Sequence, residues 1–455
     1  RNRVNSGVGL GTIVSALIVS FCTVADEPAR SGSKNPDPKH ITGASGDQTI
    51  ALAPRNDIDD HRNLQWAFDH TAPGGTVELA AGMFFMGDGK EAPRKTAWMR
   101  RGLKVIGVKE GAIWRTVIRG GGEVLEPGVG GALESGPIRI KLDGDDHPVK
   151  LEQIWFREWS CEVVFILACN GFEFRNCRIS DPVNAADPSK IRFVHALWTQ
   201  GNDARGDFIA ENNLVELGQY DGPLAEDEQF MGIFTSNHDN IRIVNNVITG
   251  TDEAIEILMN RYGNTGEGDS VAASSPAEIV VANNKIDVTG TPGPRWGGSW
   301  AILIAGNLNV DRVLIQNNDV TKRGEGWGVG LSGANMEITG NTFRFEEHNG
   351  KLTEGAITIG GYPLLAGKAM GSSLTNSVIR DNTYVGKVRD HGMFFMPGGA
   401  GFANASSGNR IDVGDTLATL GAKTILTLSQ EMTDNEFTGR TGKVVDNAKK
   451  GANQY

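Results

Sequence analysis

Residues 240–248 read NIRIVNNVI, an alternating apolar stretch that ends in two asparagines followed by a second apolar pair. The same pattern recurs at Asn176, at Asn212-Asn213, Asn245-Asn246, Asn283-Asn284 and Asn317-Asn318, and in weaker copies at Asn341, Asn382, Asn409 and Asn435. An Asn at the same bend of every coil can hydrogen-bond to the Asn above and below it, which satisfies polar groups that would otherwise be buried unpaired. The repeat therefore predicts a stack of similar coils.

A second column of similar segments lies between the Asn copies. In each segment the third residue is Ala or Gly and the fourth is aliphatic or Met, which indicates a strand whose bend needs a small residue and whose fourth position faces the core. The segments are residues 194–198, 230–234, 252–256, 299–303, 326–330, 354–358 and 390–394. Their uneven spacing implies inserted loops, and long inserts on a regular scaffold commonly wall a binding cleft.

Together the two columns predict an all-β protein: a single-stranded, right-handed parallel β-helix with a short N-terminal capping helix. The 60 glycines and the low aromatic content of 7% favour strands and turns over packed helices. The capping helix is expected after Asp59-Asp60, because Leu64, Ala67 and Phe68 follow at helical spacing.

The chain divides by composition into four segments. Residues 1–25 are expected to be a signal peptide, and residues 26–56, rich in Pro, Gly, Ser and Asp, a flexible leader. The β-helix is expected over residues 57–440, and residues 441–455 are expected to form a C-terminal tail. The elongated fold is usually stable alone, so we expect a monomer.

The net charge and the N-terminal residues indicate the partners and the compartment of the protein. The net charge of −11 comes without a basic stripe, which argues against nucleic acid as the main partner. Arg1 and Arg3 precede an apolar run over residues 8–19, and Ala25 follows at a plausible cleavage position. That run is too short to span a membrane. We therefore expect a secreted protein, extracellular or periplasmic, without membrane contact after signal removal.

Three cysteines remain after the signal peptide: Cys161, Cys169 and Cys177. Their number is odd and their spacing matches no familiar zinc pattern, so we expect buried thiols.

The chain resembles the pectate-lyase-like β-helix superfamily, which includes pectate lyases, polygalacturonases, alginate lyases and uronan epimerases. The resemblance is carried by the expected helix, by GGTVEL at residues 74–79, by GMF at residues 82–84 and by the Asn-Asn coils. It implies a polysaccharide partner, but the superfamily also contains non-catalytic fibres, so the fold alone does not fix a reaction.

The closest local likeness is to polygalacturonases, where a similar coil carries paired aspartates. Asp252 and Glu253 stand where that pair would lie. The next coil should then carry His-Gly but reads Ser299-Trp300-Ala301, and a His-Gly occurs only later, at His391. The catalytic segments of the named families are therefore incomplete in this chain.

The first, second and fifth positions of the second column are expected to form one exposed ridge. Carboxylates flanked by aromatic rings suit a sugar-binding cleft, because rings stack on pyranose faces while carboxylates bind hydroxyls or metal or transfer protons. The candidate catalytic residues are Asp252, Glu253, His195, His391 and Asp390. The candidate substrate-binding residues are Trp198, Phe234, Arg295, Trp300, Trp327 and Glu354, with Arg261 and Arg389 as further carboxylate binders. Asp252, Glu253 and Glu256 are candidate ligands for Ca²⁺.

Three functions stay open at this point. The first is a polysaccharide lyase acting on an acidic, uronate-containing glycan, with His195 or His391 as base. The second is a glycoside hydrolase resembling polygalacturonases, with Asp252 and Glu253 as acid and partner. The third is a non-catalytic adhesin or carbohydrate-binding surface protein.

Overall fold

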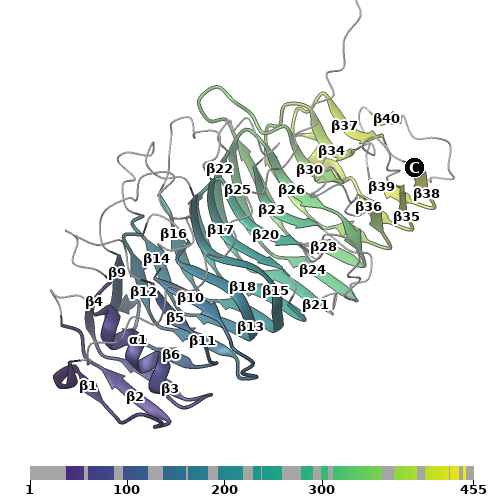
Figure 1. Cartoon of the computed structure of the whole chain (residues 1–455). Coiled ribbons are helices and arrows are strands. Elements are labelled where there is room, and N and C mark those ends of the chain that lie inside the picture. The colour runs from purple at the N-terminus through teal and green to yellow at the C-terminus, as the bar shows by residue number, and fades with distance from the viewer. Residues whose placement is uncertain are drawn as a thin grey trace, which may run out of the picture.

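The computed structural model describes residues 37–55, 60–86, 96–120, 137–159, 162–182, 193–218, 229–236, 238–258, 278–290, 299–305, 311–360, 373–396, 405–429, 431–439 and 444–446. Over these residues the chain is a right-handed parallel β-helix, as predicted (Figure 1). The strands stack along one long axis in chain order, and three columns of parallel strands form three faces of the coil.

Face 1 contains the second sequence column. Its strands are β5 (Ala97–Met99), β10 (Ile138–Lys141), the first part of β13 (Val164–Arg175), the first part of β15 (Phe193–Glu211), β17 (Gln229–Ser236), β20 (Glu253–Leu258), β23 (Trp300–Ala305), β26 (Trp327–Leu331), β30 (Gly355–Ile359), β34 (His391–Phe395), β37 (Thr424–Leu428) and β40 (Val444–Asp446).

Face 2 joins face 1 through the two long strands β13 and β15, whose second parts belong to it. Its other strands are β2 (Thr49–Leu52), β3 (Thr76–Leu79), β6 (Lys104–Ile106), β11 (Val149–Glu152), β18 (Asn240–Val244), β21 (Glu278–Ala282), β24 (Arg312–Gln316), β28 (Met336–Thr339), β32 (Val378–Arg380), β36 (Arg410–Asp412) and β39 (Glu436–Thr438).

Face 3 is a separate 10-stranded sheet. Its strands are β4 (Gly82–Met86), β9 (Thr116–Gly120), β12 (Trp155–Arg157), β14 (Arg178–Ser180), β16 (Leu214–Glu216), β19 (Val247–Thr251), β22 (Lys285–Gly290), β25 (Asp319–Gly324), β29 (Thr342–Glu346) and β33 (Thr383–Gly386). The remaining elements are the 3₁₀ helix η1 (Pro38–His40), β1 (Ile41–Thr42), β7 (Lys109–Glu110), β8 (Ile113–Trp114), β27 (Gly333–Ala334), β31 (Leu374–Thr375), β35 (Ala405–Ser407), β38 (Glu431–Thr433) and the helices α1 (His61–His70) and α2 (Gly414–Ala418).

The predicted capping helix is α1, which lies at the N-terminal end of the stack (Figure 1). It buries Leu64, Ala67 and Phe68, the residues whose spacing predicted it. Asp60 plays a different part from the expected helix cap. Its carboxylate accepts hydrogen bonds from the main-chain N–H groups of Arg55 (3.1 Å) and Phe85 (3.0 Å), so it ties the entry of the helix to β4.

The β-helix begins before residue 57 and ends after residue 440, the two boundaries predicted from the sequence. Within the predicted leader 26–56, β2 pairs in parallel with β3 and buries Ile50 and Leu52. Within the predicted tail 441–455, β40 pairs with β37. Both strands are short, so their alternation did not stand out from the surrounding polar residues. The predicted signal peptide at residues 1–25 and Cys161 lie outside the described residues.

The Asn signature has two separate roles in the structure. The first residue of each pair adopts the left-handed conformation, with φ of 58° at Asn245 and 55° at Asn283, a region that Asn enters more readily than most residues. The second Asn points into the coil and builds the ladder. Asn246 Nδ2 donates to Asn284 Oδ1 (3.0 Å), and Asn284 Nδ2 donates to Asn318 Oδ1 (2.9 Å).

The ladder is continuous between face 2 and face 3. Its members are Asn213, Asn246, Asn284, Asn318, Asn341 and Asn382. The predicted copies at Asn409 and Asn435 lie elsewhere. They bond to each other at the bend that precedes β36 and β39, because the later coils carry Asn one bend earlier in the coil. The single Asn column predicted from the sequence therefore corresponds to two separate ladders in the structure.

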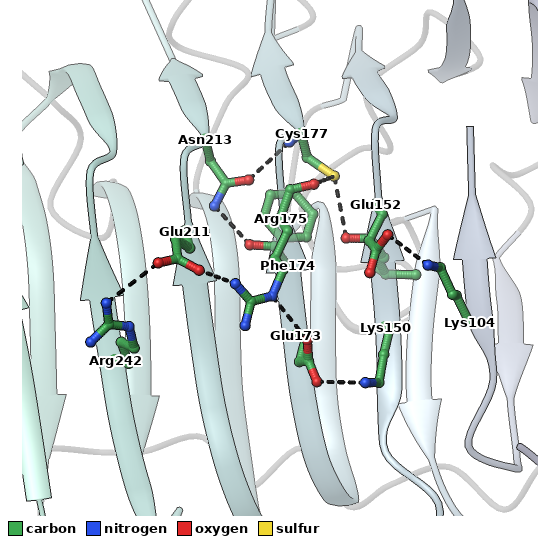
Figure 2. Close-up of polar contacts among 11 residues, drawn as sticks. Lys104, Lys150, Glu152, Glu173, Phe174, Arg175, Cys177, Glu211, Asn213 and Arg242 are labelled. Carbon is green, nitrogen blue, oxygen red and sulfur yellow. Dashed lines mark hydrogen bonds and ion pairs between the residues drawn. The ribbon is translucent and has the colours of Figure 1, made fainter. Parts of the chain in front are cut away.

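Cys177 occupies the ladder position of the earliest copy, and its N–H donates to Asn213 Oδ1 (2.9 Å; Figure 2). Cys177 and Cys169 are buried free thiols, as predicted, and burial raises the pKa of each to about 12. Among the residues that the structure describes, no helix has the length and apolar character needed to cross a membrane.

The outer surface of face 2 is an ion-pair lattice (Figure 2). Lys104 pairs with Glu152 (2.9 Å), and Lys150 pairs with Glu173 (2.8 Å). Arg175 pairs with Glu173 on its own strand and with Glu211 on the next coil. Pairs of this kind are partly solvated, and each contributes little stability. The outer surface of face 2 is therefore an ordinary solvent-facing sheet surface.

The ladder generates a stability prediction. Replacing Asn284 by Ala leaves the facing amides of Asn246 and Asn318 short of one partner each and frees the carbonyl of Ile243. Each buried polar group left unpaired costs about 1–3 kcal/mol, so we expect a loss of roughly 3–5 kcal/mol, measured by chemical denaturation. Asn283→Gly is the matched control, because Asn283 is exposed and its φ suits glycine; it should change little. Equal losses in the two variants would contradict the ladder.

Candidate active face

The strand register confirms the alignment of the second sequence column. Val194 pairs with Phe230, and Met231 with Glu253. Trp300 pairs with Trp327 on the following coil. The outward-pointing second and fifth positions of face 1 therefore form two continuous columns, as the sequence predicted.

The expected exposed ridge is wrong in one respect: five of its side chains are buried and the others are half-buried. The exposed fractions are 3% for His195, Glu253 and Glu256, 6% for Trp300 and 5% for Trp327. Trp198, Phe234, Glu354, Asp390 and His391 are half-buried. Outward side chains of face 2 make solvated ion pairs, whereas those of face 1 are largely withdrawn from water. This contrast marks face 1 as the candidate site.

A central cluster forms where face 3 turns into face 1. Asp252 Oδ1 accepts a hydrogen bond from the main-chain N–H of Phe230 (2.8 Å), and the Asp252 carbonyl accepts one from the Ser299 hydroxyl. Lys322, on β25, points inward, is fully buried and donates from Nζ to Ser299 Oγ (2.7 Å). Lys322 was not predicted as a site residue, because a lysine in a strand is ordinarily read as solvent-facing.

Burial dominates the electrostatics of this cluster. It raises the pKa of Asp252 to about 7, against the opposing effects of the Phe230 N–H and the Lys322 ammonium. It lowers the pKa of Lys322 to about 7, against the attraction of Asp252 and Glu253. A carboxyl and an amine that both titrate near neutrality are suited to proton transfer.

An upstream cluster lies on β10, β13 and β15. Arg139 is fully buried, its Nη2 lies 3.4 Å from Glu162 Oε2, and its guanidinium lies 4.6 Å from the centroid of the Phe165 ring. Glu162 is buried too, and burial raises its pKa despite the nearby guanidinium. Val163 N–H donates to the His195 carbonyl, which places Glu162 beside His195 in the register, and the His195 ring meets Trp198 edge-on at 4.4 Å.

Arg139 and Glu162 were also missing from the sequence prediction. They precede the first Asn copy, so no column aligned them with His195. The signal that could have found them is the apolar alternation around Arg139, in which Ile138 and Ile140 face the core.

Aromatic rings fill the space after the central cluster. Trp300, Leu303, Trp327 and Leu258 form one apolar cluster, with Phe234 and Phe394 packed against it. Two glycines make room for it. A Cβ on Gly330 would lie 2.8 Å from Trp300 Nε1, and a Cβ on Gly355 would lie 2.4 Å from the Trp327 ring.

A downstream cluster contains His391. Its ring stacks on Phe394, with 4.4 Å between centroids, and its Nδ1 lies 2.9 Å from Thr424 Oγ1. The Asp390 carboxylate pairs with Arg389 and Lys423, which hold the pKa of Asp390 below its usual range against the opposing effect of burial. Thr424 and Thr427, rather than Asp390, thus orient His391. Arg389 also pairs with Glu354 (3.1 Å).

The predicted calcium ligands do not form a metal site by themselves. Among the described residues, which include Asp252, Glu253 and Glu256, no group of three His, Cys, Asp or Glu side chains is placed to hold a metal ion. Arg261 and Arg295 lie outside the described residues.

A cavity of about 410 Å³ lies on face 3, at the ends of β14, β16, β19 and β22. Its carboxylates are already engaged in ion pairs: Glu216 with Arg178 (2.8 Å), Asp181 with Arg157 (3.4 Å) and Asp287 with Arg323. It therefore offers a ligand fewer available charged groups than its lining suggests.

Comparison with known proteins finds similar structures and no matching sequence. No protein family model and no curated protein sequence matches the chain. A mannuronic acid specific polysaccharide family 6 lyase from human gut microbiota shares 13% identity, with a TM-score of 0.49, over 87% of this chain and 82% of that one. The A-module of the Azotobacter vinelandii mannuronan C-5 epimerase AlgE6 shares 15% identity, with a TM-score of 0.40, over 90% and 96% of the two chains.

A third similar structure is the Yersinia enterocolitica family 28 exopolygalacturonase, at 11% identity and a TM-score of 0.39, over 91% of this chain and 78% of that one. The likeness to these structures extends over most of this chain. At these identities it carries no argument about the reaction.

The central cluster generates a pH prediction. The folded protein keeps a proton on Asp252 up to about pH 7, whereas the unfolded chain loses it near its ordinary value of 3.8. The stability contribution of this proton is therefore present below that value and is lost as pH rises through the folded pKa. Asp252→Asn cannot lose a proton, so its denaturation midpoint should rise relative to wild type between about pH 4 and about pH 7 and then level off. A difference between the two proteins that stays constant with pH would contradict the raised pKa.

Proposed function

We propose that this protein is an exported enzyme that cleaves an acidic polysaccharide by β-elimination along face 1. The observation that supports the proposal is that ionisable side chains which point out of the sheet are nevertheless buried among aromatic rings. Strongly perturbed ionisable groups cluster at functional sites more than elsewhere. Flat rings beside such groups are what a pyranose chain requires.

β-Elimination from a uronate needs three functions, and the upstream cluster offers one group for each. A cation must neutralise the substrate carboxylate, which suits Arg139 because a guanidinium binds a carboxylate in two-pronged fashion. A base must remove the proton next to that carboxylate, which suits the imidazole of His195. A proton donor must reach the leaving oxygen, which suits Glu162, because its raised pKa favours the protonated carboxyl.

The other clusters extend the site along the stack. The side-chain columns place Glu253 two coils from His195, and neighbouring coils lie about 4.8 Å apart. The ring of Trp198 lies on the His195 coil and that of Phe234 on the intervening coil, with 6.0 Å between centroids. A bound glycan lying along face 1 would therefore contact rings and carboxylates in turn.

Hydrolysis is the second candidate, favoured by the central cluster. Asp252 has a pKa of about 7, which suits a general acid at neutral pH, and Glu253 is its neighbour in the chain. In that case a glycosidic bond would be cut by water with Asp252 donating the proton.

The test is a screen of residues 26–455 against alginate, pectate, glucuronans, glycosaminoglycans and neutral glycans, with and without Ca²⁺. Absorbance at about 235 nm reports the unsaturated product of elimination, and reducing ends report either reaction. We expect the absorbance to rise on a uronate polymer and to fall by about 100-fold or more in His195→Ala, which removes the base. Lys285→Met, an exposed change on face 3, is the control and should keep full activity.

Other outcomes point elsewhere. Reducing ends without new absorbance, lost in Asp252→Asn, would replace elimination by hydrolysis. A requirement for Ca²⁺ would show that ligands beyond the described residues complete a metal site. If the folded protein produces neither absorbance nor reducing ends from any glycan, a non-catalytic carbohydrate-binding role is favoured.

A further inference from the structure

Lys322 is an amine buried inside the coil. Its neighbours in the inward column of face 3 are Val288 on the preceding coil and Phe345 on the next, both buried. Withdrawing an ammonium from water costs several kcal/mol unless partners compensate, and an apolar side chain of similar size would suit the column as well or better. The position of Lys322 therefore calls for a role beyond packing.

The ammonium is aimed at the bend that carries Asp252 and Glu253. Lys322 Nζ donates to Ser299 Oγ (2.7 Å), and the Ser299 hydroxyl donates to the Asp252 carbonyl. The carboxylates that attract the ammonium are Asp252 and Glu253. A chain of hydrogen bonds thus runs from the core of one coil to the turn into face 1 two coils earlier.

The surrounding backbone leaves space for this one side chain. A Cβ on Gly290, the residue before the turn on the intervening coil, would lie 1.9 Å from the Glu325 carbonyl oxygen and 2.4 Å from Lys322 Nζ, so this glycine serves both the backbone contact and the lysine. Three successive coils therefore combine to admit the lysine: β20 supplies the carboxylates, the chain at Gly290 and Ser299 supplies the gap and the hydroxyl, and β25 supplies the charge.

We propose that Lys322 is a positioning residue of face 1: from inside the coil it neutralises Asp252 and Glu253 and, through Ser299, holds the bend that presents them to a bound glycan. The proposal rests on the function proposed above. Lys322 is screened from the substrate by the sheet, so it acts through the two carboxylates and is not itself a catalytic residue.

The experiment compares Lys322→Met, Asp252→Asn, the double variant and the control Lys285→Met. Methionine keeps the length and apolar stem of the lysine, so the folded state survives. We expect kcat to fall about 100-fold in Lys322→Met on the glycan that wild type cleaves, because a small misplacement of reacting groups has an effect of that size. KM should stay within about 3-fold, since the aromatic rings that bind the chain are unchanged.

A lysine with a merely structural role would give another result. It would lower the denaturation midpoint of Lys322→Met while leaving kcat, measured well below that midpoint, within about 3-fold of wild type. That result overturns the proposal.

A second readout does not depend on any substrate. If Lys322 neutralises Asp252, the two single substitutions shift the denaturation midpoint by amounts that do not add, and the double variant is more stable than their sum predicts. Additive shifts of the denaturation midpoint overturn the proposal, even if the enzyme is active.

If the wild type cleaves no glycan, the proposed function is wrong. The midpoint of the double variant still decides whether the buried lysine is coupled to the bend at Asp252.

Discussion

The register between coils is the constraint on which the rest of the structure depends. A parallel stack that slips by one residue would send every inward side chain outward. The Asn ladder prevents such a slip, because each amide such as that of Asn246 binds both the amide and the main chain of its neighbours. The left-handed residue before it fixes where the bend falls. With the bends fixed, the outward columns of face 1 are fixed as well.

That constraint explains how residues far apart in the sequence come together. Arg139, His195, Glu253 and Trp327 are separated by inserted loops of different length, yet each occupies an outward position on the same face. The loops change nothing in the register, so the fold can vary its inserts while keeping one line of side chains. Face 2 carries solvated ion pairs under the same constraint (Figure 2), which shows that the buried character of face 1 is a property of its residues rather than of the coil.

Much of this arrangement could be predicted from the sequence, because it is periodic. The ladder from Asn213 to Asn382 and the alignment of His195 with Glu253 and Trp300 follow from repeated residue types. Lys322 could not be predicted, since only the packing of three coils shows that it points inward. Arg139 and Glu162 precede the first clear repeat, and the strand at Ile50 is too short to show a period. Burial of the ridge was missed for a related reason: the pattern of one strand cannot show what covers it.

The most direct test of face 1 as the site is a crystal structure of an inactive variant, His195→Ala or Glu253→Gln, with an oligosaccharide of the polymer that binds best. The account predicts a sugar chain lying across β10, β13, β15, β17 and β20, with rings against Trp198 and Phe234 and a carboxylate near Arg139. A chain bound instead over face 2, or in the cavity beside Arg178, would contradict it.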